Sequence, residues 1–121
     1  MEHEPDLPDP DAPERVRRAR DDAARSAEEL ARQWEQVVEA SEFTNNDDEH
    51  DPEGSTIAYE REQVRSMLGR VKRELEALDL AAERLREGTY WTCERCGGPI
   101  DPDRLAARPT ARACIGCARR P

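Results

Sequence analysis

Four cysteines arranged in two pairs constrain this chain of 121 residues more than any other feature. Each pair encloses two residues, and seventeen residues (97–113) separate the pairs. Two CxxC pairs at this spacing are typical of a zinc site, and four thiolate ligands leave no coordination position open for a catalytic water. The sequence therefore predicts one structural Zn²⁺ ion, whose ligands are Cys93, Cys96, Cys114 and Cys117.

Redox motifs and disulfide bonds are the other common uses of paired cysteines, and neither explains two matched pairs. Gly97 and Gly98 follow the first pair, where an open backbone lets amides turn back toward the sulfurs. A small apolar core is expected around the metal. Its predicted members are Tyr90, Trp91, Ile100, Leu105 and Ile115.

Two helical patterns precede the cysteines. Between residues 14 and 42, small or apolar residues recur at alternating spacings of four and three: Ala23, Ala27, Leu30, Trp34 and Val37. A second series recurs every seven residues: Ile57, Val64, Val71, Leu78 and Leu85. The intervening positions of this seam hold Leu68, Leu75 and Ala82, and its only charged member is Arg61. Such seams are typical of helices that pack side by side. We therefore predict an antiparallel coiled-coil hairpin over residues 14–87, although the same seams also allow two chains to pair.

Charge and turn residues predict the remaining segments. Residues 1–13 combine five acidic residues with four prolines and contain no lysine or arginine, so we expect a disordered acidic tail. Residues 43–55 contain Pro52, Gly54 and two asparagines and should form the tip of the hairpin. Residues 88–121 would form the zinc finger module. The expected fold is all-α apart from this finger, and short-loop closure favours a monomer.

The composition argues against several classes of function. Charged residues make up 39% of the chain and the formal net charge is −9, which opposes broad binding to nucleic acid phosphates. The sequence has neither an apolar stretch long enough to span a membrane nor a secretory signal pattern, so a cytoplasmic protein is expected. His3 and His50 lack the neighbours of a catalytic dyad, and we expect no enzyme.

The finger resembles that of the DksA/TraR family of bacterial transcription regulators. The resemblance rests on the stretch from Gly88 to Cys117, which includes the segments CERCGGPI, RLAARP and CIGC. The hairpin upstream looks like that family's coiled coil, and the segment DDEHDPEGSTIAYER is similar to the tip of small actinobacterial-type members.

This resemblance implies RNA polymerase as the partner, bound through its secondary channel, with acidic residues of the tip near the catalytic centre. The family's tip motif is Asp-Pro-x-Asp-x-Ala. Asp51 and Pro52 match it, whereas Gly54 replaces the second aspartate and Thr56 replaces the alanine. Neighbouring acidic residues can supply the missing charge. The expected tip residues are Asp47, Asp48, Glu49 and Asp51.

Two other functions remain open from the sequence. The chain could be a coiled-coil adaptor that carries a structural zinc finger and has no direct role with polymerase. A nucleic-acid-binding zinc ribbon would need a basic face, which only the last segment offers, so no sequence-specific DNA binding is expected. Four arginines of that segment either balance the zinc thiolates or bind a partner. They are Arg95, Arg104, Arg108 and Arg112.

Overall fold

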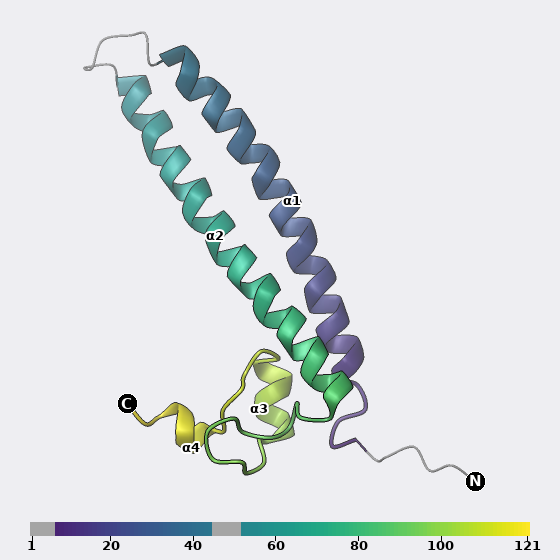
Figure 1. The fold of residues 1–121 in the computed structure, drawn as a ribbon. Coiled ribbons are helices and arrows are strands. Elements are labelled where there is room, and N and C mark those ends of the chain that lie inside the picture. Colours follow the sequence, from purple (N-terminus) through teal and green to yellow (C-terminus); the bar gives the residue numbers. More distant parts are fainter. Residues whose placement is uncertain (1–6, 45–51) are drawn as a thin grey trace. The chain divides into compact units, whose positions relative to one another are not determined.

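The computed structural model describes residues 7–44 and 52–121, with side chains for 7–42 and 56–121. Within these residues the chain forms helices α1 (Ala12–Thr44), α2 (Pro52–Glu87), α3 (Pro102–Ala107) and α4 (Ile115–Ala118). The only β-type pairing in the described part is an isolated bridge between Thr92 and Pro99. The predicted all-α hairpin with a C-terminal finger is confirmed (Figure 1). None of the described helices is long and apolar enough to cross a membrane.

Helix α1 begins at Ala12, two residues before the start predicted from the sequence. Asp9 stabilises the start of the helix. Its carboxylate accepts a hydrogen bond from the backbone N–H of Asp11 at 3.0 Å and forms an ion pair with Arg15 at 2.7 Å. The hydrogen bond from Arg15 holds the pKa of Asp9 below its usual value. Residues 7–11 of the predicted tail thus lead into the helix through a turn, whereas residues 1–6 lie outside the described residues.

Helix α2 begins at Pro52, inside the segment predicted as the tip. Proline suits the first helical position because the N–H it lacks has no helical partner there. At the other end Gly88 stops the helix as predicted: its φ of 80° is readily adopted by glycine. The N–H of Thr89 closes the last turn on the carbonyl of Arg84 at 2.9 Å.

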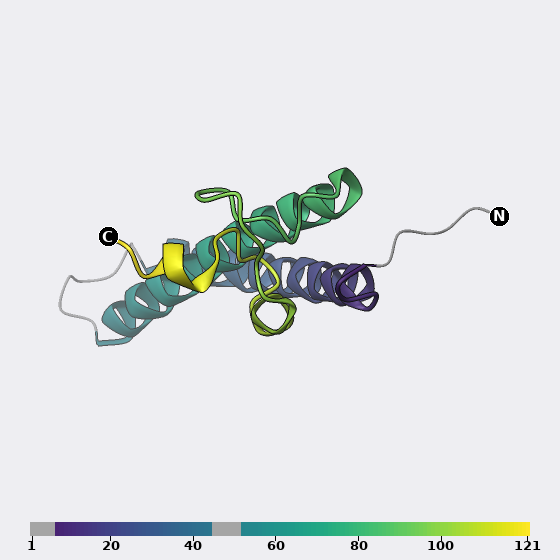
Figure 2. The ribbon, with the colours of Figure 1, turned by 90° about the horizontal axis from the view of Figure 1, so that it is seen from below.

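The chain divides into two compact units, which we call the finger unit (Met1–Asp21 with Glu76–Pro121) and the hairpin unit (Asp22–Leu75). In the finger unit, the chain that follows α2 folds back on the helix ends, as Figure 2 shows. One core of buried side chains joins the start of α1, the end of α2 and the finger. Its members are Ala12, Val16, Ala81, Tyr90, Cys93, Ile100, Leu105 and Cys117.

The hairpin unit consists of α1 from residue 22 and α2 up to residue 75, which run antiparallel (Figure 1). Its predicted apolar seam residues are half-buried, apart from Leu30, since two helices alone seldom enclose a side chain fully. Among the described residues of this unit only Leu30 and Ser41 are buried. Arg61, the one charged residue of the α2 seam, is exposed and places its guanidinium 5.6 Å from the ring centre of Trp34.

Candidate metal centre

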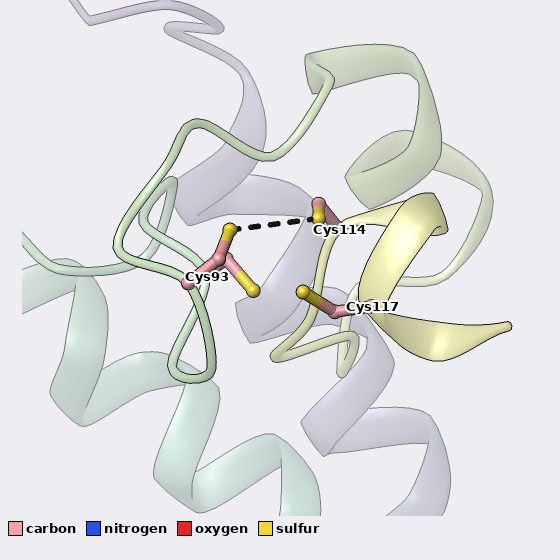
Figure 3. Close-up of side chains that lie close together, drawn as sticks. Cys93, Cys114 and Cys117 are labelled. Atoms are coloured by element: carbon pink, nitrogen blue, oxygen red, sulfur yellow. Dashed lines mark hydrogen bonds between the residues drawn. The ribbon is translucent and has the colours of Figure 1, made fainter. Parts of the chain in front are cut away.

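The four predicted ligands come together in the finger unit. The sulfur atoms of Cys93, Cys96, Cys114 and Cys117 all lie within 4.8 Å of one another, and Figure 3 shows those of Cys93, Cys114 and Cys117 directed toward a common centre. A tetrahedral zinc ion about 2.3 Å from each sulfur requires sulfurs about 3.8 Å apart. The sulfur atoms of Cys96 and Cys114 are 3.8 Å apart. The cluster therefore has the donor set and the dimensions that zinc requires.

The first pair of cysteines sits on a tight turn built by its glycines. Gly97 has a φ of 75° and donates its N–H to the carbonyl of Cys93 at 3.0 Å. The N–H of Gly98 then points at the sulfur of Cys96, 3.4 Å away, while the carbonyl of Gly98 accepts from the N–H of Cys93 at 2.8 Å. The predicted role of these glycines is confirmed, because the turn directs an amide dipole at a thiolate.

The second pair lies at the start of α4. Cys114 is the residue that precedes the helix, and Cys117 lies within it. The N–H of Ala118 donates to the carbonyl of Cys114 at 2.9 Å, which closes the single turn between the two ligands. The guanidinium of Arg95 donates to the carbonyl of Cys117 at 2.8 Å and so ties the first pair to the second.

The pKa values of Cys93, Cys114 and Cys117 show how closely these thiols interact with their surroundings. Hydrogen bonds from backbone amides, first that of Cys114, lower the pKa of Cys93 to about 6. The amide of Cys117 lowers the pKa of Cys114 in the same way. In contrast, the hydrogen bond with Cys114 and burial raise the pKa of Cys117 to about 12. A divalent cation bound at this cluster would favour the thiolate form of its ligands.

The core around the cluster differs from the prediction in two ways. Tyr90, Ile100 and Leu105 are buried as expected, and the Tyr90 hydroxyl donates to the carbonyl of Pro109 at 2.8 Å. Ile115, however, is 53% exposed, so its predicted place in the core is wrong. Ile115 and Cys117 lie two positions apart in α4, so they point to opposite sides of the helix, and Cys117 is the buried one. Ala12 and Val16 of α1 fill the core in its place.

Arg84 is an organising residue that the sequence analysis missed. It is only 5% exposed, and its guanidinium donates to the carbonyls of Thr89 at 2.9 Å and Thr92 at 2.7 Å. These bonds fix the chain between α2 and the first cysteine pair. A basic residue in the last turn before a helix-stopping glycine was the available signal, because cations there can bond free carbonyls.

Three of the four finger arginines singled out from the sequence bind groups within the finger. Arg104 donates to the carbonyl of Ala113 at 3.0 Å, and Arg112 pairs with Glu94 at 3.4 Å. With Arg95 bound to Cys117, three of the four have internal partners. The interpretation that they balance and brace the zinc site is thus favoured over a free basic face. All four predicted tip residues, Asp47, Asp48, Glu49 and Asp51, lie outside the described residues.

Comparison with known proteins identifies this finger. Residues 88–121 match the family model of the prokaryotic DksA/TraR C4-type zinc finger. The fold matches the structure of the transcription factor DksA2 from Pseudomonas aeruginosa with a TM-score of 0.58 and 28% sequence identity, over 95% of this chain and 88% of that one. Residues 88–121 are thus a zinc finger of the DksA/TraR type, and the chain has the fold of DksA2. It carries one structural zinc site, and the four clustered cysteines are the residues that would hold the ion.

Curated relatives match shorter regions of this chain. General stress protein 16O of Bacillus subtilis is 30% identical over 77 residues, and the protein YlyA of the same organism is 36% identical over 55 residues. A protein of Aquifex aeolicus is 48% identical over 44 residues. These matches cover 47%, 44% and 30% of the relatives' own lengths, so the chain spans less than half of each.

Proposed function

We propose that this chain is a transcription regulator that binds RNA polymerase through the secondary channel. The observation that carries the proposal is the match to DksA2, which extends over both helices of the hairpin and the finger. A shared finger alone would also suit an adaptor protein. A match over 95% of the chain favours a member that retains the hairpin along with the finger.

The proposed mechanism uses the two units differently. The finger unit, organised by zinc, would hold the ends of α1 and α2 together, and the hairpin unit would present the acidic segment that joins them. Asp47, Asp48, Glu49 and Asp51 carry four negative charges within five residues. Such a cluster can act on a nearby metal ion or on basic groups of a catalytic centre. The chain would act by binding, without catalysing a reaction itself.

Direct binding tests this proposal. The zinc-loaded chain, labelled with a photo-crosslinker at Asn46, is mixed with purified RNA polymerase from the same organism. A stable complex should form, and the crosslinks should fall on polymerase residues that line the secondary channel. A second crosslinker at Arg119 in the finger serves as the control and should label different residues. If no complex forms with purified polymerase, the chain is an adaptor for some other partner.

A further inference from the structure

The two helices of the hairpin unit differ in whether their positively charged side chains form ion pairs. On α1, Arg25 pairs with Asp22 and Arg32 pairs with Glu29, each three residues apart on the same helix. On α2, five cations lie between residues 61 and 73, and none of them forms an ion pair with a described acidic residue. They are Arg61, Arg65, Arg70, Lys72 and Arg73. Thus both arginines of α1 in this unit are paired with acidic side chains, whereas the five cations of α2 have no such partner among the described residues.

Four of these cations gather on one side of α2. At 3.6 residues per turn, Arg61, Arg65 and Lys72 fall within about 40° of one another around the helix axis. Arg73 extends the group, because its guanidinium lies 3.4 Å from the position that a Cβ of Gly69 would occupy. We call Arg61, Arg65, Gly69, Lys72 and Arg73 the basic patch. From its first to its last residue it runs about 18 Å along the helix at 1.5 Å per residue.

Gly69 lies within this patch. Glycine in a helix interior costs about 1 kcal/mol relative to alanine, so its presence at this position needs a compensating reason. In the described structure the guanidinium of Arg73 lies against the helix at this glycine, 3.4 Å from the position that a Cβ would occupy. At the end nearest Arg61 the patch borders the ring of Trp34, which contributes an apolar edge.

The charge of the rest of the chain indicates what the patch would bind. The net charge of −9 repels a nucleic acid over most of the surface, and four cations over about 18 Å are too few to overcome that repulsion. A compact acidic surface on a folded protein matches the patch in both size and charge. We propose that the basic patch docks on an acidic surface of the protein partner of this hairpin. Under the function proposed above, that partner is RNA polymerase.

The first test compares two variants of equal charge. The patch variant carries Arg65→Gln, Lys72→Gln and Arg73→Gln, and the control carries Arg17→Gln, Arg25→Gln and Arg32→Gln on α1. Loss of three desolvated charges should weaken binding of the zinc-loaded chain to nuclease-treated polymerase by about tenfold or more. The control arginines pair within α1, so the control should bind within about twofold of the parent. Equal losses in both variants would overturn the patch.

A second test does not depend on polymerase. Oligoglutamate is titrated into the isotopically labelled, zinc-loaded chain, and amide chemical shifts are followed by NMR. The largest shifts should fall on residues 61–73, and they should disappear in the patch variant but persist in the control. Shifts centred on the finger arginines, or tighter binding of a single-stranded DNA of equal charge at the patch, would overturn the proposal. Selective oligoglutamate binding without polymerase binding would instead reject only the function proposed above.

Discussion

The finger unit and the hairpin unit achieve their folds by different means. The finger unit gathers eight buried residues into one core, and two of these, Cys93 and Cys117, are also metal ligands. The hairpin unit has long helices, yet only Leu30 and Ser41 are buried among its described residues. Metal binding therefore organises tertiary packing in one unit, whereas helix propensity, a half-buried seam and pairs such as Arg32 with Glu29 support the other.

Removing a zinc ligand should have the largest effect on stability, and it should unfold the finger unit while changing the hairpin unit little. Cys96→Ser or Cys114→Ser should abolish stoichiometric zinc binding and unfold the finger, because about 10–16 kcal/mol of apparent zinc binding free energy supports such modules. Since Val16 packs in the core that contains Cys93 and Cys117, the start of α1 should lose protection as well.

Hydrogen exchange measures the loss of protection in each unit, and metal analysis measures the zinc content of each variant. Amides near Val16 and Ile100 should exchange faster in the cysteine variants, and those near Leu30 should change little. Retention of one zinc ion per chain in both variants would contradict the proposed ligand set. Uniform loss of protection along the whole chain would contradict the separation into two units.

Two leucines on the same seam of α2 test whether the finger unit and the hairpin unit differ in how deeply they bury apolar side chains. Leu78, in the finger unit, is 1% exposed, whereas Leu68, in the hairpin unit, is half-buried. Leu78→Ala should destabilise the protein by about 2–5 kcal/mol, the usual range for a buried leucine. Leu68→Ala should cost only about 1 kcal/mol, because less apolar surface is involved. Urea unfolding followed by circular dichroism, with zinc present, measures the loss of stability in each variant. Equal losses of stability would show that the two units do not differ in how deeply they bury these leucines.

The smallest expected change in stability is an increase. Gly69→Ala should stabilise the hairpin unit by up to about 1 kcal/mol, since only the mobile end of Arg73 approaches the new methyl group. Gly88→Ala is the control and should destabilise, because its φ of 80° is unfavourable for alanine. Thermal melts of both variants test the pair. A lower melting temperature for Gly69→Ala would mean that the backbone there is more tightly enclosed than the structure shows.

The sequence predicted those features that follow from local spacing. Two CxxC pairs define a ligand set directly, and a seven-residue repeat defines a helix face, so the zinc site and the hairpin were both expected. The core of the finger unit was harder, because Val16 lies about 75 residues from the nearest cysteine and outside the recognised seam. Ile115 was misplaced since hydrophobicity alone does not show which way a four-residue helix turns. Arg84 was missed because a charged residue is seldom fully buried.

Under the function proposed above, the acidic segment between α1 and α2 regulates transcription while other surfaces provide most of the binding. The decisive measurement is transcription in a reconstituted system with the parent and a variant carrying Asp47→Asn, Asp48→Asn, Glu49→Gln and Asp51→Asn. A control replaces Glu35, Glu39, Glu60 and Glu62 with glutamine. The account predicts that the tip variant binds polymerase within about twofold of the parent yet loses its effect on transcription, while the control keeps both. Regulation by the tip variant equal to that of the parent would contradict the account.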